Sequence, residues 1–271
     1  MSASAAIDPT PGVKKPDPLL VVNDLRRRFG GLVAVDVEHL EVQRHSITAL
    51  IGPNGAGKTT LFNVLTGFDH ADLGAWRFDD VDVTGWPAYR LARFGMVRTF
   101  QLTKALAGMT VLDNMLLGAN KQQGERLATA AFRFRWSARE REVREHAIEL
   151  LENFGLADKQ NDLAATLSGG QRKLLEMARA LMAVPMLVML DEPMAGVNPA
   201  LVQSLLDHIR QVRDLGITVV FVEHDMDVVS SIADWVVCMA EGHVIAEGPP
   251  DVVVSNEQVI DAYLGQNRSA S

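Results

Sequence analysis

The sequence predicts an α/β fold in which helices cover a parallel β-sheet. Residues 187–190 and 218–222 are continuous apolar runs typical of buried parallel strands, and the amphipathic stretch 201–215 between them completes a βαβ unit. A third apolar run, 46–51, leads into a glycine-rich loop that is followed by apolar residues at helical spacing. Strand, glycine loop and helix form the order that phosphate binding requires.

Two further segments extend this core. The apolar runs 19–22 and 33–35, separated by the turn signal Gly30-Gly31, predict a β subdomain with antiparallel strands near the start of the chain. Residues from about 103 to 166 are rich in helix formers and charge, which predicts an inserted, mostly helical subdomain. The chain shows no internal repeat of fixed period, so we expect a single cassette.

Composition narrows the class of protein. With 48% hydrophobic and 22% charged residues over 271 positions, the chain is neither wholly disordered nor collagen-like. Its 26 Lys and Arg against 34 Asp and Glu give a net charge of −8, which weakens attraction to nucleic-acid phosphates, so we expect no nucleic-acid partner. The single cysteine, Cys238, cannot form an internal disulfide and fits a reducing cytosol.

The ends of the chain carry no targeting signal that we can identify. Residues 1–18 are small, polar and proline-bearing, without the apolar core of a secretory signal, and are predicted to form a disordered tail. Residues 266–271 are predicted to form a C-terminal tail, which leaves 19–265 as the folded domain. The longest apolar run, 180–190, is interrupted by Pro185 and falls short of the roughly 20 residues that cross a bilayer.

The glycine-rich loop matches the pattern G-x-x-x-x-G-K-[ST] without deviation over residues 52–59. Its backbone amides are expected to surround a β-phosphate, the charge of Lys58 to lie near the β- and γ-phosphates, and the Thr59 hydroxyl to bind Mg²⁺. The sequence therefore predicts a P-loop NTPase with a RecA-like core. The predicted nucleotide-binding residues here are Gly52, Pro53, Asn54, Gly55, Ala56, Gly57, Lys58, Thr59 and Thr60.

Two acidic residues follow the apolar run 187–190. Asp191 falls at the carboxyl end of this strand, where ligands of open α/β sheets bind, and is predicted to hold Mg²⁺ through water. Glu192 points elsewhere by strand alternation and is a candidate to polarise the attacking water in phosphoryl transfer.

A second anion site is predicted at residues 167–171, Leu-Ser-Gly-Gly-Gln, which open a helix over 172–182. Ser168 is expected to be its N-cap, and Gly169, Gly170 and Gln171 lie in the first turn. One chain rarely needs two phosphate cradles for one nucleotide. The simplest interpretation is that each cradle forms half of a site shared across a dimer.

This pentapeptide resembles the signature of the ATP-binding subunits of ABC transporters. The resemblance implies that Ser168 and Gly170 contact the γ-phosphate of ATP held by the partner's phosphate loop. It implies that Phe29 stacks on adenine and that Gln101 touches Mg²⁺ and senses the membrane subunit. It also implies that His224, which follows the strand 218–222, reaches the γ-phosphate. Asn198 departs from the family, in which many members carry aspartate.

Several segments look like the branched-chain amino-acid importer branch of that family: 98–101, 192–199, 223–226, 245–248 and 262–265. The resemblance extends from about residue 19 to 265. Urea and short-chain amide importers share the branch, and a lipopolysaccharide-export ATPase looks similar over the same motifs. The substrate is the weaker part of the resemblance because such a subunit does not touch the transported solute.

The resemblance implies an ATP-hydrolysing subunit that uses ATP and Mg²⁺ and powers a separate permease. Its expected partners are transmembrane permease subunits, a second ATP-binding subunit that is either identical or related, and indirectly a solute-binding protein. The expected location is peripheral, on the cytoplasmic face of the cell membrane. Two other classes share the phosphate loop: a non-transport ABC ATPase, and a P-loop GTPase or kinase, which does not explain residues 167–171.

Overall fold

The computed structural model describes residues 10–99, 107–119 and 133–269, and it contains two β-sheets. The six-stranded sheet has the order β10-β9-β3-β8-β7-β6. Its strands are β3 (Ile47–Ile51), β6 (Met96–Arg98), β7 (Leu187–Asp191), β8 (Thr218–Val222), β9 (Trp235–Ala240) and β10 (His243–Gly248). All pairs are parallel except β9 with β10.

The second sheet is antiparallel and has the order β2-β1-β4-β5. Its strands are β1 (Pro18–Phe29), β2 (Leu32–Gln43), β4 (Leu73–Phe78) and β5 (Val81–Asp82). The turn between β1 and β2 falls at Gly30 and Gly31, as predicted. The antiparallel β subdomain and the parallel core are thus both confirmed.

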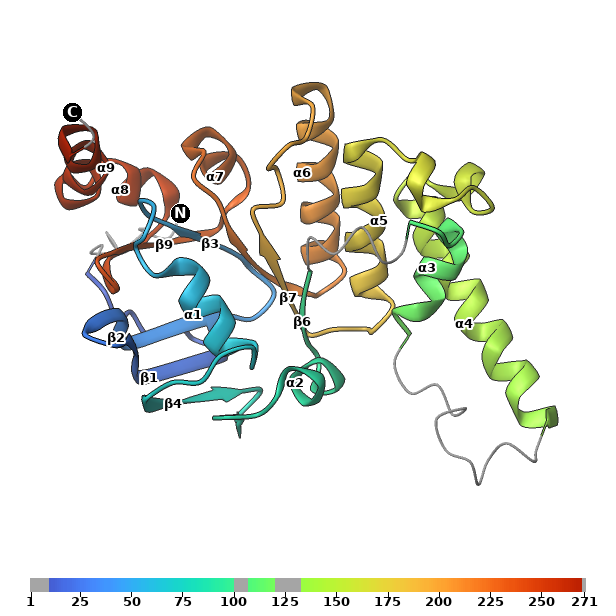
Figure 1. Ribbon diagram of the computed structural model, residues 1–271, viewed down its shortest axis with the longest axis horizontal. Coiled ribbons are helices and arrows are strands. Elements are labelled where there is room, and N and C mark those ends of the chain that lie inside the picture. Colours follow the sequence, from blue (N-terminus) through green and yellow to red (C-terminus); the bar gives the residue numbers. More distant parts are fainter. Residues whose placement is uncertain (1–9, 100–106, 120–132, 270–271) are drawn as a thin grey trace, which may run out of the picture.

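The helices lie around these sheets (Figure 1). They are α1 (Lys58–Leu65), α2 (Ala88–Phe94), α3 (Val111–Leu117), α4 (Arg133–Asn153), α5 (Gly169–Leu181), α6 (Pro199–Asp214), α7 (Met226–Ile232), α8 (Pro250–Val254) and α9 (Glu257–Ser269), with short 3₁₀ turns at Ala157–Lys159 and Ala164–Thr166. Helices α3, α4 and α5 form the helical region seen at the right of Figure 1, and α6 lies beside α5 on the face of the parallel sheet opposite α1. The helical region includes α5 and therefore extends past residue 166.

Helix α1 is packed between the two sheets. Its buried Leu61 and Phe62 belong to one apolar cluster with Trp76 of β4 and with Met189 and Val220 of the parallel sheet. A second cluster joins the other face of that sheet to α5, α6 and the helical region. The phosphate-loop helix is therefore held on both sides by buried apolar contacts, which fixes its start relative to the strand ends.

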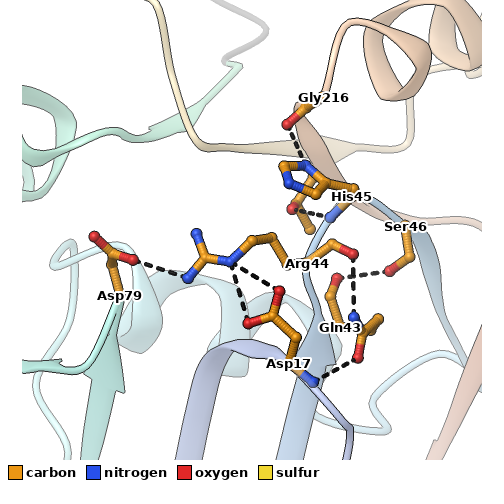
Figure 2. Close-up of polar contacts among 8 residues, drawn as sticks. Asp17, Gln43, Arg44, His45, Ser46, Asp79 and Gly216 are labelled. Carbon is orange, nitrogen blue, oxygen red and sulfur yellow. Dashed lines mark hydrogen bonds and ion pairs between the residues drawn. The ribbon is translucent and has the colours of Figure 1, made fainter.

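The connection from β2 to β3 joins both sheets at the end opposite the phosphate loop (Figure 2). Arg44 donates to the Asp79 carboxylate at 2.8 Å and pairs with Asp17 at 3.4 Å. The next residue, His45, donates its backbone N–H to the Thr218 hydroxyl at 2.9 Å and contacts the Gly216 carbonyl through its ring. These polar contacts set where β3 begins.

The predicted tails differ from the structure. The backbone N–H groups of Gly12 and Val13 donate to the buried Glu247 carboxylate at 2.6 and 2.7 Å, and Lys15 lies 3.3 Å from the centre of the Trp235 ring. The prediction of a disordered tail is therefore wrong for residues 12–18, because their polar groups have buried partners far along the chain. Helix α9 likewise continues to Ser269, into the predicted C-terminal tail.

Candidate functional site

Four adjacent parallel strands bring the predicted residues to one edge of the sheet. In the order β3, β8, β7, β6, their carboxyl ends lead to the phosphate loop, His224, Asp191 with Glu192, and the segment that carries Gln101. Because parallel strands all end at the same edge, residues distant in sequence meet there. Gln101 lies outside the described residues.

Two glycines of the phosphate loop, Gly52 and Gly57, lie where a residue with a Cβ atom would not fit. Gly52 has φ +143°, and a Cβ there would lie 2.1 Å from the Met239 carbonyl oxygen. Gly57 has φ +100°, and its Cβ would lie 2.3 Å from the Ala34 oxygen. Gly57 is also the N-cap of α1 and, having no side chain, makes no capping hydrogen bond to the first-turn amides. The loop therefore presents backbone N–H groups at a helix start, which is an anion site.

Lys58 lies along the inside of this loop. Its Nζ donates to the carbonyls of Gly52 and Pro53 at 2.6 and 2.9 Å. Burial lowers the pKa of Lys58, and the nearby carboxylates of Glu192 and Asp191 oppose that shift by favouring the charged form. The ammonium is therefore positioned between the loop and the two acids, where a phosphate would bind. Thr59 follows it and is exposed at the start of α1.

Asp191 and Glu192 diverge at the end of β7. Asp191 Oδ2 accepts from Arg98 Nη2 at 2.6 Å, and no hydrogen bond to Oδ1 is found among the described residues. A carboxylate oxygen is a hard ligand of the kind that Mg²⁺ prefers. Glu192 has φ +46°, an uncommon conformation for a glutamate, and its N–H donates to the Val222 carbonyl at 3.1 Å. The left-handed backbone turns the chain sharply after the strand.

A buried glutamate connects the loops after β7 and β8. Glu223 is 1% exposed and accepts from the backbone N–H groups of Met194 and His224 at 2.9 and 3.3 Å. Burial raises the pKa of Glu223, while these backbone hydrogen bonds oppose the shift. His224 itself is 66% exposed in its side chain, within 3.7 Å of the Glu223 carboxylate. Glu223 thereby fixes the backbone on which His224 is carried.

The second predicted anion site lies at the start of α5. Ser168 is the N-cap: its hydroxyl accepts from the Gln171 N–H at 3.3 Å, and Gln171 Oε1 accepts from the Ser168 N–H at 3.0 Å. This capping box confirms the predicted N-cap. Gly170 leaves room for Leu201, since a Cβ there would lie 2.5 Å from the leucine side chain. Helix α5 packs on the face of the parallel sheet opposite the one that carries α1, and the two helices lie apart in Figure 1.

Two other predicted residues lie at the margins of the site. Phe29 ends β1, is 49% exposed, and has the Arg27 guanidinium 4.6 Å from its ring centre. Asn198 is the N-cap of α6 and accepts from the Ala200 N–H at 2.9 Å. Because its amide oxygen caps this helix, asparagine replaces the family's aspartate without loss of the cap.

Sequence reasoning missed three residues that shape the site: Arg98, Glu223 and Tyr263. The Tyr263 hydroxyl of α9 accepts from the Gly52 N–H at 2.8 Å, and burial raises the pKa of Tyr263 to about 12. Each acts across more than 25 residues of sequence, so spacing alone does not reveal the contact. The signal for Glu223 was its place directly after a buried strand.

The loop, the acidic strand end and the parallel sheet together define a P-loop ATPase, and the second cradle on α5 defines the type built from ATP-binding cassettes. A family model described as ABC transporter matches residues 35–195, and one described as branched-chain amino acid ATP-binding cassette transporter matches 243–268. The chain belongs to the ABC transporter family, as one of its ATP-hydrolysing subunits.

Relatives and solved structures agree over nearly the whole chain. The chain is 41% identical to a probable branched-chain amino acid transport ATP-binding protein LivG of Archaeoglobus fulgidus, covering 93% of this chain and 97% of the relative. It is also 41% identical to the high-affinity branched-chain amino acid transport ATP-binding protein BraF of Pseudomonas aeruginosa, covering 92% and 98%. The ADP conformation of an ATP-binding cassette of an ABC transporter superposes with a TM-score of 0.81 at 38% identity, covering 92% and 99%.

Proposed function

We propose that this chain powers the import of branched-chain amino acids or related small polar solutes by hydrolysing ATP at the site described above. The observation that carries the solute class is the match of residues 243–268 to the C-terminal segment of branched-chain transporters. In the structure this segment reaches the phosphate loop, because Tyr263 accepts from the Gly52 N–H. The relatives named for branched-chain transport support the same assignment.

We assign the following roles in hydrolysis. The amides of residues 52–60 and Lys58 bind the phosphates, and Phe29 stacks on adenine. Thr59, Asp191 and Gln101 would hold Mg²⁺, which neutralises phosphate charge when bound. Glu192 accepts the proton of the attacking water, and His224 contacts the γ-phosphate. The support is that Lys58 lies with both acids at one sheet edge, where Asp191 Oδ1 accepts no hydrogen bond from the residues that the structure describes.

The separation of α5 from α1 supports a dimeric site. Ser168 caps α5, which packs on the face of the parallel sheet opposite α1, and we infer that the anion of its cradle comes from a second chain. That second chain is a copy of this one or a related ATP-binding subunit. ATP bound between the two cradles favours the closed pair, and loss of the γ-phosphate favours opening.

Membrane attachment is proposed to come from permease subunits that bind in a groove between the helical region and the parallel sheet. Among the described residues, no helix combines the length and apolarity that a membrane span needs. The groove has a volume of about 430 Å³ and mixes charged residues of α4 with apolar ones of the 182–186 segment. Its lining includes Phe94, Arg139, Glu142, Val184 and Met186. Val184 is 75% exposed.

The test is to isolate the tagged protein from detergent-solubilised native membranes and identify the co-purifying chains by mass spectrometry. The proposal expects two permease subunits, an ATP-binding subunit and an amino-acid-binding protein. Recovery of a urea- or amide-binding protein would change the solute, and recovery of lipopolysaccharide-export components would change the direction of transport. Recovery of ribosomes or DNA-repair factors would overturn transport while leaving the ATPase in place.

The groove is tested in the same experiment by Val184→Glu. A charge at this exposed position should reduce permease recovery at least about tenfold, because it places a carboxylate in the buried contact. Leu215→Glu, at a position 65% exposed after α6, is the matched control and should keep permease recovery unchanged. Equal recovery with both variants would place the permease elsewhere.

A further inference from the structure

Arg98 lies where three elements of the site meet. It is the last residue of β6, and its side chain is 7% exposed. One terminal nitrogen, Nη2, donates to Asp191 Oδ2 of β7 at 2.6 Å, and the other, Nη1, donates to Asn63 Oδ1 of α1 at 2.6 Å. The guanidinium also lies 5.7 Å from the centre of the Phe62 ring.

The geometry of these bonds restricts the Asp191 carboxylate. A guanidinium is planar and its N–H groups have fixed directions, so two short bonds to different elements fix the positions of both acceptors relative to each other. Asn63 lies one turn after Thr59 on the helix that begins at the phosphate loop. Arg98 thus sets the distance between Asp191 and the start of that helix, and within the described part of the chain it engages only Oδ2 of the carboxylate.

The same residue connects Asp191 to the strand that precedes Gln101. Arg98 is paired in register with Met189 of β7, and the next residue, Thr99, donates its N–H to the Met189 carbonyl at 3.0 Å. A shift at the end of β6 would carry Arg98 with it, and the carboxylate bonded to Arg98 would follow.

We infer that Arg98 is a positioning residue for the magnesium site, which orients the Asp191 carboxylate and ties its position to β6. This inference rests on the proposed function, which assigns Mg²⁺ to Thr59 and Asp191. An ion pair that serves stability alone would affect nucleotide binding equally with and without metal. A positioning residue affects only the part of binding that depends on the metal.

The experiment measures binding of a non-hydrolysable ATP analogue by calorimetry, once with Mg²⁺ and once with excess EDTA, for wild type, Arg98→Met and Arg98→Lys. The quantity compared is the ratio of the two dissociation constants. Arg44→Met is the control, because Arg44 also bonds a carboxylate at 2.8 Å but precedes β3, whereas the phosphate loop follows it.

We expect the Mg²⁺ enhancement of binding to fall about tenfold in Arg98→Met, with metal-free binding within about twofold of wild type. Arg98→Lys keeps the charge but cannot reach Asn63 and Asp191 together, so about a threefold fall is expected. Arg44→Met should match wild type. If Arg98→Met does not fold, the Arg98→Lys ratio decides.

Unchanged Mg²⁺ enhancement in the folded variants would overturn the positioning role and leave the proposed function intact. An equal loss with and without Mg²⁺ would do the same, since it indicates a purely structural ion pair. Wild-type binding that does not respond to Mg²⁺ would instead contradict the metal assignment of the proposed function, and the inference about Arg98 would fall with it.

Discussion

The Lys58 ammonium donates to the carbonyls of the phosphate loop. Replacing this single residue tests whether its charge contributes to phosphate binding. Lys58→Met deletes a charge that lies between the Gly52 carbonyl and the two carboxylates. We expect ATP binding to weaken roughly 100-fold, or about 3 kcal/mol, because charge-assisted bonds to phosphate are lost. Calorimetric titration with ATP measures this. Binding within threefold of wild type would show that the loop amides suffice.

Glu176 provides a pH-dependent test. It lies on α5, burial raises its pKa above the ordinary value of 4.5, and its buried Oε1 has no hydrogen-bond partner among the residues that the structure describes. A raised native pKa means that the stability associated with the protonated form is present below pH 4.5 and is lost as pH rises through the native pKa. Glu176→Gln removes the ionisation and should be the more stable protein at pH 8, by about 1 kcal/mol.

The measurement for Glu176 is thermal unfolding of wild type and variant from pH 5 to pH 8. The stability difference should shrink as pH falls. Glu149→Gln, which replaces an exposed carboxylate on α4, serves as the control. A difference that is constant with pH would mean that Glu176 does not titrate between the folded and unfolded states as described.

The sequence motifs predict the main side chains of the candidate site, but not the backbone conformation there or the residues that hold those side chains in place. Spacing alone predicts Lys58, Asp191 and Glu192 as site residues, because a strand end and a glycine loop have sequence signatures, and the structure brings the three close together. The positive φ of Glu192 has no such signature, since glutamate rarely adopts it. The bond from Arg98 to Asp191 joins positions 93 residues apart, which only the sheet order brings together.

At the scale of elements, Ser168 has two roles that can be tested separately: it caps helix α5, and it is proposed to contact a γ-phosphate. Ser168→Ala removes the acceptor for the Gln171 N–H and should lower stability by about 1 kcal/mol. Ser168→Asp retains an N-cap acceptor, so its stability should stay near wild type. Its carboxylate would face a γ-phosphate, however, and ATP hydrolysis should fall at least about tenfold.

Thermal unfolding and phosphate release measure the two effects of the Ser168 variants. Wild-type hydrolysis by Ser168→Asp would contradict the assignment of the α5 start to the nucleotide of a second chain. Unchanged stability of Ser168→Ala would instead indicate that the glycines and Gln171 hold the helix start without the serine.

Elements with strong periodicity were predicted well, and their ends less so. The unit formed by β7, α6 and β8 agrees with the apolar runs and the amphipathic stretch between them. Helix α5 begins at Gly169, three residues before the predicted start at 172, because the capping box extends the helix into its glycines. Glycine has a low helix propensity, which argues against a helix that starts in this segment. Close packing of Leu201 against Gly170, where a Cβ would not fit, outweighs that preference.

At the scale of the whole molecule, the N-terminal segment is held to the last strand of the parallel sheet by Glu247. This carboxylate is fully buried and accepts from Gly12, Val13 and the Trp235 indole, with Lys15 at 3.5 Å. Deletion of residues 1–16 removes Gly12, Val13 and Lys15. Of these four partners, the Glu247 carboxylate would then keep only the Trp235 indole. We expect a loss of about 3 kcal/mol in the free energy of unfolding.

Denaturant unfolding measures this loss, and deletion of residues 2–9 is the control because it leaves the contacts of Gly12, Val13 and Lys15 in place. Equal stability of both deletions and the full chain would show that Glu247 is satisfied by water. The sequence could not predict this contact, since residues 1–18, which are small and polar and include four prolines, have the composition of a disordered tail.

Glu192 is assigned as the group that accepts the proton from water when ATP is hydrolysed at the phosphate loop. ATP binding and phosphate release by Glu192→Gln, measured beside wild type in one assay, test this role. We expect ATP affinity within about threefold of wild type and hydrolysis reduced at least about 100-fold. Hydrolysis at the wild-type rate would contradict it.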